Sequence, residues 1–371
     1  MKRLQYHFEP RCGWMNDPNG LVYFNGQYHA FFQHFPYAPQ WGPMHWGHAM
    51  SQDLIHWREL PVALRPDQVY ENDGGCFSGS AVSLGDQLYL FYTSVSRHLG
   101  QTQSMAYSGD GLHFTKCAAN PILPACPVNS GEPRGNRDFR DPKVTYIQGR
   151  YYMVCGTGVD GVGKVLLFTT DDLVHWEYLG VLFSGGPEGS DHFYGTVIEC
   201  PDFFYLDGHY VLMFSKMGSL YSATHFVIGD FDGEHFTPQQ HVELEEGPDF
   251  YAPQTLLAPD GRRLMIGWMY HWGKPLPQGA YSAGALSLAR ELSIEQGRLH
   301  ARPVREAACL LTEASPFVRV SGRTLTIESP ACGHILSHEL PAGTPLQILE
   351  DTKTIEVFTA DGTWNATAWL E

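Results

Sequence analysis

Three carboxylates stand at matching places in the sequence. Asp17, Asp141 and Glu199 each precede, by eight or nine residues, a glycine at the centre of a turn-like segment. If these segments belong to equivalent units of one fold, the three side chains converge on one site. Like charges gathered in a confined site cannot all ionise at their normal pKa, so the pKa of one group rises and that group can act as an acid. Such a set of carboxylates is what hydrolysis of a glycosidic bond requires.

Any one of these acids, taken alone, would ordinarily be a turn or capping residue. Their surroundings favour a site, because the segment from Trp14 to Gly20 places Asp17 among turn-forming residues and beside an aromatic side chain. Flat apolar faces for sugar rings are available at Trp41, Trp46, Trp57 and Trp268. Three acids at matched positions, with aromatic side chains available, therefore predict a carbohydrate site.

The elements that must position these acids repeat along the chain. Five aromatic-rich strand pairs are joined by turns centred on Gly26, Gly85, Gly149, Gly208 and Gly261, at steps of 53 to 64 residues. Asn-Gly and Asp-Gly are strong hairpin turns because both central positions tolerate positive φ.

A second marker, Asp-x-x-His-aromatic, falls between these hairpins. Its histidines are His56, His113, His175 and His235. Two markers with the same period indicate a repeated unit of about four short strands, so we predict an all-β fold with a five-bladed β-propeller over residues 1–306. The aspartate of the second marker recurs from unit to unit, so we expect it to stabilise a turn.

The repeat stops after Pro303. Residues 307–371 alternate in places, as in the run from Thr354 to Thr359. We predict a small C-terminal β-unit there, similar to a shortened β-sandwich.

Composition excludes several classes of protein. The chain has 371 residues, with 24 Lys and Arg against 40 Asp and Glu and a formal charge of −16. Phosphates are repelled by such a chain, so neither nucleic acid nor an anionic membrane is an expected partner. No run approaches the roughly 18 apolar residues of a membrane span. The oligomeric state stays open, a homo-oligomer included.

Location and cofactors follow from smaller signals. The N-terminus has no apolar stretch of a secretory signal, and the eight cysteines form no C-x-x-C pair, so we expect reduced thiols and a cytoplasmic location. His45 and His48 have no third ligand nearby, so we expect no metal. The glycine-rich segments lack the lysine and the helix of a phosphate loop, so nucleotide binding is not expected.

The signature segments together resemble glycoside hydrolase family 32, the β-fructofuranosidases. They are Trp14–Gly20, Arg140-Asp141-Pro142 and Glu199-Cys200, with support from Trp41–His48, Phe77–Ser80, Asp249–Gln254 and Arg290–Ser293. The matches run in family order from residue 7 to about residue 305. Family members usually carry a C-terminal β-sandwich of well over a hundred residues, whereas this chain offers 65. That departure leaves the packing of the C-terminal unit open.

The resemblance implies a five-bladed propeller and a retaining mechanism without metal or cofactor. Asp17 would be the nucleophile at the anomeric C2 of a fructosyl unit, Glu199 the general acid/base, and Asp141 the transition-state stabiliser. Retention requires the carboxyls of Asp17 and Glu199 to lie ~5–5.5 Å apart. Glu199 would need a pKa above that of Asp17. The candidate substrate-binding residues are Asn16, Gln33, Trp41, Phe77, Ser78, Arg140, Cys200, Tyr251 and Trp268.

The resemblance predicts exo-release of fructose from sucrose, sucrose 6-phosphate or short fructooligosaccharides. Three alternatives stay open from the sequence. An arabinan- or xylan-cleaving enzyme would be inverting, with carboxyls ~6.5–9.5 Å apart. A fructosyltransferase would use a sugar in place of water, and a fructan-binding propeller would have no need of a nucleophile and an acid.

Overall fold

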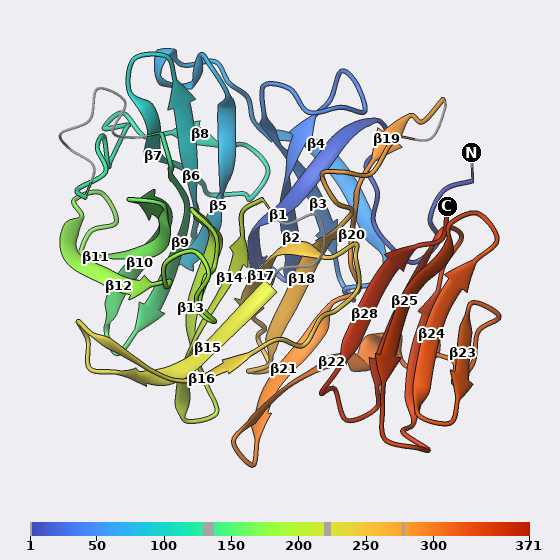
Figure 1. Cartoon of the computed structure of the whole chain (residues 1–371). Coiled ribbons are helices and arrows are strands. Elements are labelled where there is room, and N and C mark those ends of the chain that lie inside the picture. Colours follow the sequence, from blue (N-terminus) through green and yellow to red (C-terminus); the bar gives the residue numbers. More distant parts are fainter. Residues whose placement is uncertain (1, 129–136, 219–223, 277–278) are drawn as a thin grey trace.

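The fold consists of antiparallel sheets. The computed structural model describes residues 2–128, 137–218, 224–276 and 279–371 (Figure 1). Within these ranges the chain forms 28 strands and two short 3₁₀ helices, η1 (Val69–Glu71) and η2 (Arg305–Ala307), and no α-helix. The predicted all-β class is therefore confirmed.

Five sheets of four or five strands follow one another along the chain. The first contains β1 (Gly13–Phe24), β2 (Gln27–Phe35), β3 (His45–Ser51) and β4 (Trp57–Leu64), with β19 (Ser282–Ala283) parallel to β1. The second contains β5 (Gly75–Leu84), β6 (Gln87–Ser96), β7 (Gly100–Ser108) and β8 (Thr115–Lys116). The third contains β9 (Phe139–Ile147), β10 (Arg150–Val159), β11 (Val162–Thr170) and β12 (Glu177–Ser184). The fourth contains β13 (Ile198–Leu206), β14 (His209–Lys216), β15 (Thr224–Phe231) and β16 (Phe236–Val242). The fifth contains β17 (Tyr251–Leu257), β18 (Arg263–Met269), β21 (Arg290–Glu295) and β22 (Arg298–Pro303), and β20 (Ala285–Leu286) also pairs with β18.

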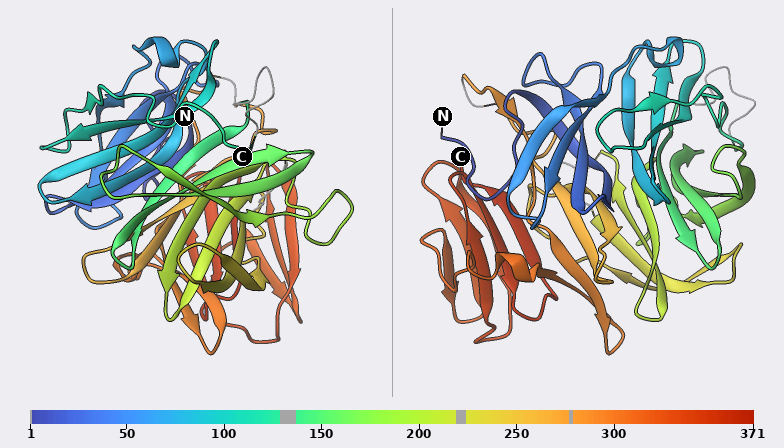
Figure 2. Two further views of the ribbon diagram at one scale, coloured as in Figure 1. Left: turned by 90° about the vertical axis from the view of Figure 1, so that its left-hand side faces the viewer. Right: turned by 180° about the vertical axis from the view of Figure 1, so that it is seen from behind.

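The first strands of these sheets adjoin one another. Contacts run from β1 to β5, from β5 to β9, from β9 to β13 and from β13 to β17, and β17 in turn contacts β1. The parallel pairing of β19 with β1 adds a strand from the end of this region to the first sheet. The five first strands therefore share one central region, which the sheets surround (Figures 1 and 2).

Both repeated markers form local structures that their residues favour. The five glycine-centred turns join the first two strands of each sheet, and Asn25 and Gly26 adopt φ values of 48° and 78°. In the second marker, the Asp172 carboxylate accepts the backbone N–H groups of Val174 and His175 at 2.9 and 2.8 Å. The His175 ring contacts the same carboxylate and is exposed. The predicted hairpins and the turn-stabilising aspartate are confirmed.

Residues after η2 form two three-stranded sheets that share one apolar core. One contains β23 (Val318–Ser321), β24 (Thr324–Ser329) and β25 (Gly333–Glu339), and the other contains β26 (Leu346–Glu350), β27 (Thr354–Thr359) and β28 (Asn365–Trp369). Ile327 of the first and Ile348 and Val357 of the second belong to the same buried cluster. These sheets lie against the fifth sheet, close to both chain ends (Figures 1 and 2).

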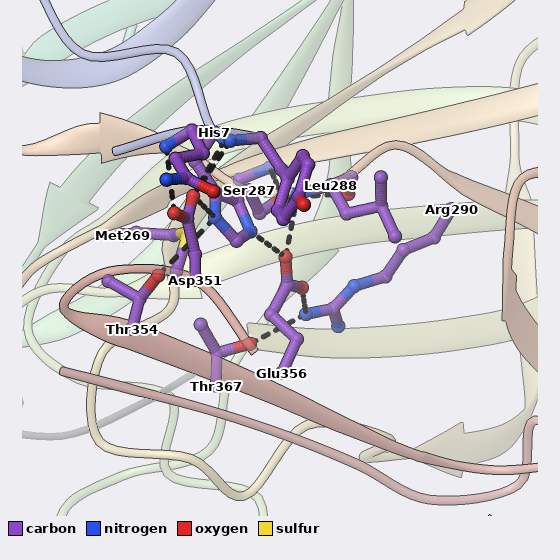
Figure 3. A network of polar contacts seen from close by, with 12 residues as sticks. His7, Met269, Ser287, Leu288, Arg290, Asp351, Thr354, Glu356 and Thr367 are labelled. Carbon is purple, nitrogen blue, oxygen red and sulfur yellow. Dashed lines mark hydrogen bonds and ion pairs between the residues drawn. The ribbon is translucent and has the colours of Figure 1, made fainter. Parts of the chain in front are cut away.

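A buried polar network joins the C-terminal sheets to the rest of the chain (Figure 3). Glu356 on β27 contacts His7 at 2.7 Å and Arg290 on β21 at 2.7 Å. Arg290 also reaches Glu245, and Asp351 holds the other nitrogen of His7 at 3.0 Å.

No helix of the described residues is long and apolar enough to cross a membrane.

Candidate active site

The three acids lie where the first strands lose their regular pairing. Every first strand carries a register shift at this point. In β1, Asn16 and Asp17 both lie opposite Gln33 of β2, between two regular pairs. In β13, Glu199 is the last regularly paired residue before the shift. Such a bulge sets two residues opposite one on the partner strand and re-aims their side chains. Consecutive residues can therefore both face the central pocket, which a regular strand would not permit.

The positions of the acids differ by one residue. Asp17 and Asp141 directly precede a proline, whereas Cys200 occupies that place in β13 and Glu199 stands one residue earlier. Asp141 and Cys200 both adopt positive φ, at 62° and 49°. Glu199 is therefore the structural counterpart of Arg140 in β9. The spacing of eight or nine residues between each acid and the next turn glycine does not reveal this one-residue difference.

A pocket of about 420 Å³ lies over these bulges. Its lining residues come from the first, second, third and fourth sheets and from the loop after β18. They are Asn16, Asp17, Gln33, Trp41, Phe77, Ser78, Gln101, Arg137, Asp138, Arg140, Asp141, Glu199 and Trp272. The structure thus brings together all three predicted acids and six of the predicted substrate-binding residues.

Asp17 lies on the buried floor and is held by neutral donors. Ser78 Oγ donates to its Oδ2 at 2.6 Å, and Asn16 Nδ2 donates to its Oδ1 at 3.0 Å. The amide of Asn16 is itself oriented by Trp14, whose Nε1–H donates to Asn16 Oδ1 at 2.7 Å. Burial raises the pKa of Asp17, while the hydrogen bonds from Ser78 and Asn16 oppose that rise. The carboxylate therefore has a fixed orientation and forms no ion pair with any residue that the structure describes.

Glu199 has a different environment. Its side chain is 20% exposed, and Arg140 Nε and Nη2 donate to Oε1 at 3.1 and 3.0 Å. The hydroxyl of Tyr251 donates to the other oxygen, Oε2. The remaining guanidinium nitrogen of Arg140 contacts Asp138 at 2.9 Å. Hydrogen bonds therefore fix both carboxylate oxygens of Glu199, on the side of the pocket where Asp138 also lies. That its pKa exceeds that of Asp17 stays a prediction.

Asp141 lines the same pocket and lies close enough to the other two acids to feel both charges. It is buried, and the backbone N–H of Cys200 donates to its Oδ2 at 2.8 Å. Burial, together with the charges of Glu199 and Asp17, raises the pKa of Asp141 to about 7, although the Arg140 cation opposes the rise. The backbone N–H of Asp141 donates to Thr93 at 2.9 Å, which holds this positive-φ residue in place. Asp141 can thus accept or donate hydrogen bonds near neutral pH.

Three predicted substrate-binding residues do not line the pocket. Cys200 and Tyr251 are buried behind it and contact the acids instead: the Cys200 thiol lies 3.4 Å from Asp17 Oδ2, and Tyr251 contacts Glu199. Trp268 is 0% exposed and packs against both Trp14 and Trp272, with ring centres 5.8 and 5.1 Å away. None of these three side chains lines the pocket, and their direct contact with a substrate stays a prediction.

Four lining residues were absent from the sequence prediction. Trp272 stacks on Trp14 at 5.6 Å and is 47% exposed, so it offers the aromatic face that was expected at Trp268. Arg137 and Asp138 stand three and two residues before Arg140 of the Arg-Asp-Pro segment, a proximity that the sequence already contains. Gln101 is the second residue of β7 and belongs to no motif, and its amide oxygen accepts from Arg140 at 3.2 Å. Only the fold places Gln101 and Trp272 at the pocket.

The histidine pair that resembled metal ligands is engaged elsewhere. His48 is buried, its ring stacks on Phe31 at 4.2 Å, and its Nε2 lies 3.0 Å from Nδ1 of His29. Burial lowers the pKa of His48 to about 3. His45 Nδ1 contacts the carbonyl of Pro43. Across the described ranges, no three His, Cys, Asp or Glu side chains are placed to hold a metal ion.

Comparisons with known proteins agree with this geometry. Residues 7–303 match the glycosyl hydrolases family 32 N-terminal domain. The chain is 42% identical over 325 residues to a sucrose-6-phosphate hydrolase of Escherichia coli, covering 82% of this chain and 65% of that protein. It is 40% identical over 358 residues to a raffinose invertase of Escherichia coli, covering 89% of this chain and 71% of that protein. The chain therefore spans 65% of the length of the first of these relatives.

Solved structures of the same family are similar over nearly the whole chain. The Bombyx mori GH32 β-fructofuranosidase superposes with a TM-score of 0.85 at 31% identity, covering 99% of this chain and 89% of that one. A variant of that enzyme in complex with sucrose gives a TM-score of 0.83 at 30% identity, with the same coverage. With a family match over residues 7–303 and with the signature residues gathered in one pocket, the chain belongs to glycoside hydrolase family 32.

Proposed function

We propose that this protein is a retaining glycoside hydrolase that releases β-D-fructose by exo-cleavage from sucrose, sucrose 6-phosphate or short fructooligosaccharides. The observation that carries the proposal is the unequal environment of the acids in one pocket. Asp17 is buried among neutral donors, whereas Glu199 is partly exposed and held by Arg140 and Tyr251. Two carboxyls with different environments can take different roles in one reaction. The relatives' own activities, sucrose-6-phosphate hydrolase and raffinose invertase, support the substrate class.

In the first step, Asp17 attacks the anomeric C2 of the fructosyl unit. The bond between C2 and the leaving oxygen breaks as Glu199 gives its proton to that oxygen, and a covalent fructosyl-enzyme forms. Ser78 and Asn16 keep the attacking carboxylate in one orientation, which lowers the entropic part of the barrier.

In the second step, Glu199 acts as a base. It takes a proton from a water molecule whose oxygen attacks C2, and the bond between C2 and Asp17 breaks to release fructose. Arg140 and Tyr251 hold Glu199 through both steps, so the same oxygen atoms can give and take the proton. Asp141 lies beside both acids and would hold fructosyl hydroxyls and stabilise the positive charge that develops at C2.

The pocket residues supply the sugar contacts in this proposal. Trp41 and Phe77 offer apolar ring faces, and Gln33 lines the floor, where its amide donates to Cys76 O at 3.0 Å. Cys200 is a supporting residue behind Asp17 and Asp141. A phosphorylated leaving group would meet Arg137, which lines the pocket and forms no ion pair among the described residues.

We further propose the domain organisation on which this site rests. The five successive sheets would be the blades of a five-bladed β-propeller over residues 1–306, and the two three-stranded sheets of residues 307–371 a shortened β-sandwich-like unit. The mutual contacts of the five first strands and the shared core of the C-terminal sheets support this division. The absence of a C-x-x-C pair among the eight cysteines supports a cytoplasmic location.

The decisive experiment compares fructose release by the purified protein from sucrose, sucrose 6-phosphate and 1-kestose. Asp17→Asn should abolish release from all three, and Glu199→Gln should harm these sugars far more than an activated aryl β-fructofuranoside, whose leaving group needs no proton. The matched control is Asp172→Asn, an exposed acid at a turn remote from the pocket in sequence, which should leave the rates unchanged. Near-normal sucrose cleavage by Asp17→Asn would refute the nucleophile assignment.

Stereochemistry and acceptor preference separate the remaining readings. In water containing methanol, a retaining enzyme should form methyl β-D-fructofuranoside, whereas the α-anomer would indicate an inverting site. Fructosyl transfer to a second sugar in place of fructose release would favour a transferase. A folded protein that binds fructosides without cleaving any of them would favour the binding-protein reading.

A further inference from the structure

A layer of buried polar side chains lies directly beneath the active-site bulges. Each first strand places a polar residue two positions beyond a bulge residue (Asp17, Ser78, Asp141, Cys200 or Ala252), and all five polar residues are buried. These residues are Asn19, Ser80, Lys143, Asp202 and Gln254. An apolar layer would be the ordinary way to fill a core, so a lysine and an aspartate at this position call for an explanation.

The charged members of this layer bind three first strands together. Lys143 Nζ on β9 contacts Asp202 Oδ2 on β13 at 2.9 Å and donates to the Thr255 carbonyl on β17 at 2.6 Å. The same Asp202 oxygen accepts the backbone N–H of Thr255 at 2.7 Å. The pair therefore fixes β9, β13 and β17 relative to one another.

These strands carry two of the three acids, Asp141 and Glu199, and the tyrosine that holds Glu199. Lys143 lies two residues after Asp141, and Asp202 lies three residues after Glu199. Thr255 lies four residues after Tyr251, whose hydroxyl holds Glu199. A shift at the Lys143–Asp202 pair would thus be transmitted over a few residues of rigid strand to the carboxyls.

Neutral members of the layer extend the same linkage to the second sheet. Gln254 Nε2 on β17 donates to the carbonyl of Gly79 at 2.6 Å, next to Ser78 on β5. Ser80 Oγ donates to the carbonyl of Pro142 at 2.8 Å and accepts the N–H of Val144 at 2.9 Å, which ties β5 to β9. The polar layer therefore also holds β5, the strand whose Ser78 orients Asp17.

Stability alone is a poor reason for this arrangement. Lys143 is 6% and Asp202 0% exposed at the side chain, and replacing a buried ion pair with well-packed apolar residues is often neutral or stabilising. Burial also lowers the pKa of Lys143, which Asp202 opposes, so the pair is costly to keep charged. What the pair does provide is one fixed relative position of three strands, because its hydrogen bonds have defined lengths and directions.

We propose that Lys143 and Asp202 are positioning residues for fructoside hydrolysis, which hold Asp141 and Glu199 at the separation that the transition state requires. This inference rests on the proposed function. The pair contacts no substrate and acts through the strands. Misplacement of a catalytic group by about 1 Å can lower a rate about 100-fold without weakening binding equally, so the expected signature is a loss of kcat with a small change in KM.

The test uses Lys143→Met, Asp202→Leu and the double variant. Each single variant leaves a buried charge without its partner and should lower the melting temperature. The double variant removes both charges of the pair, so it should melt above the single variants. Its kcat on sucrose should nevertheless fall at least about tenfold, with KM changed less than about threefold and a smaller loss on an activated aryl β-fructofuranoside. The kcat of Asp202→Glu, which keeps the charge, should fall less than the kcat of Asp202→Leu.

A matched control separates positioning from stability. Arg262 forms a largely buried ion pair with Glu306 at 2.6 Å, outside the pocket, and Arg262→Met should lower the melting temperature without changing kcat. A double variant of Lys143 and Asp202 with wild-type kcat would overturn the proposal. If the double variant does not fold, Gln254→Leu serves instead, since it removes a neutral member of the layer; an unchanged kcat there would equally refute the inference.

Failure of the proposed function has a different outcome. In that case the wild-type protein itself releases no fructose from any substrate. The variants would then be compared by calorimetric binding of fructose, and a dissociation constant unaffected by the double substitution would overturn the positioning role.

Discussion

The buried His7 network predicts that the protein loses stability on the alkaline side, between about pH 6.5 and pH 9. His7 is fully buried, with Nδ1 3.0 Å from Asp351 and Nε2 2.7 Å from Glu356 (Figure 3). Burial alone would lower the pKa of His7, but hydrogen bonds and charges of Asp351 and Glu356 outweigh it and raise the pKa to about 9. His7 is therefore a buried cation at neutral pH.

The sign and size of the effect follow from this shift. The pKa is 6.5 in the unfolded chain and about 9 in the folded protein, so folding takes up a proton between these values. A difference of this size corresponds to about 3 kcal/mol. That stabilisation is fully present below pH 6.5 and is lost as the pH rises through 9. For a chain of 371 residues, about 3 kcal/mol corresponds to roughly 4 °C in melting temperature.

The assay is urea unfolding at a series of pH values from 6 to 10, on the wild type and on His7→Gln. Glutamine keeps a polar side chain but cannot be a cation, so its unfolding free energy should lie about 3 kcal/mol below the wild type at pH 6. The gap should close by about 3 kcal/mol as the pH passes 9. Asp141 titrates in both proteins and cancels from the difference.

His175→Gln is the matched control, because the His175 ring is exposed and contacts only an exposed acid. Its pH profile should parallel that of the wild type. If the His7→Gln and wild-type profiles run parallel from pH 6 to pH 10, His7 is not a buried cation and the reasoning is refuted. A gap that widens above pH 9 would contradict the sign.

Two further predictions concern the pocket. Ser78→Ala removes a donor that opposes the rise in the pKa of Asp17, so the acidic limb of the kcat/KM profile should move to higher pH by about one unit. The control is Ser108→Ala, because Ser108 is a buried serine that donates to a turn aspartate instead. An acidic limb that does not move in Ser78→Ala would count against Asp17 as the ionised nucleophile. Trp272→Ala should lower kcat/KM for 1-kestose about tenfold, a loss of about 1.4 kcal/mol of apolar contact, while methyl β-D-fructofuranoside is cleaved as before. Trp272→Phe should largely restore the rate on 1-kestose. Equal losses on both substrates would instead place Trp272 at the fructosyl unit.

Much of the fold could be predicted because its signals are local. The turn centred on Gly26 and the aspartate of the second marker act within a few residues, through positive φ and through acceptance of nearby N–H groups. Repetition of these short-range preferences indicated the all-β class and the number of repeated units. The family resemblance likewise depended on contiguous segments such as Trp14–Gly20.

The sequence also indicated that the three acids share one site, because the first strands of a repeat surround a common centre, although Glu199 stands one residue earlier than its two counterparts. It could not place the residues that lie behind that centre. Trp268 and Trp272 are four residues apart and of the same type, yet one is buried and the other lines the pocket. Which aromatic face meets the substrate depends on where β18 ends and how the following chain turns.

Only the tertiary structure decided how the acids are controlled. The bulges aim the acids at the pocket, and the fold brings Tyr251 and Cys200 into contact with Glu199 and Asp17. The pairing of Lys143 with Asp202 joins residues on two different sheets, with no spacing in the chain that would announce it. Local sequence determines which strands and turns form, whereas burial and charge pairing are set by segments far apart in the chain, and these fix the chemistry of each carboxyl.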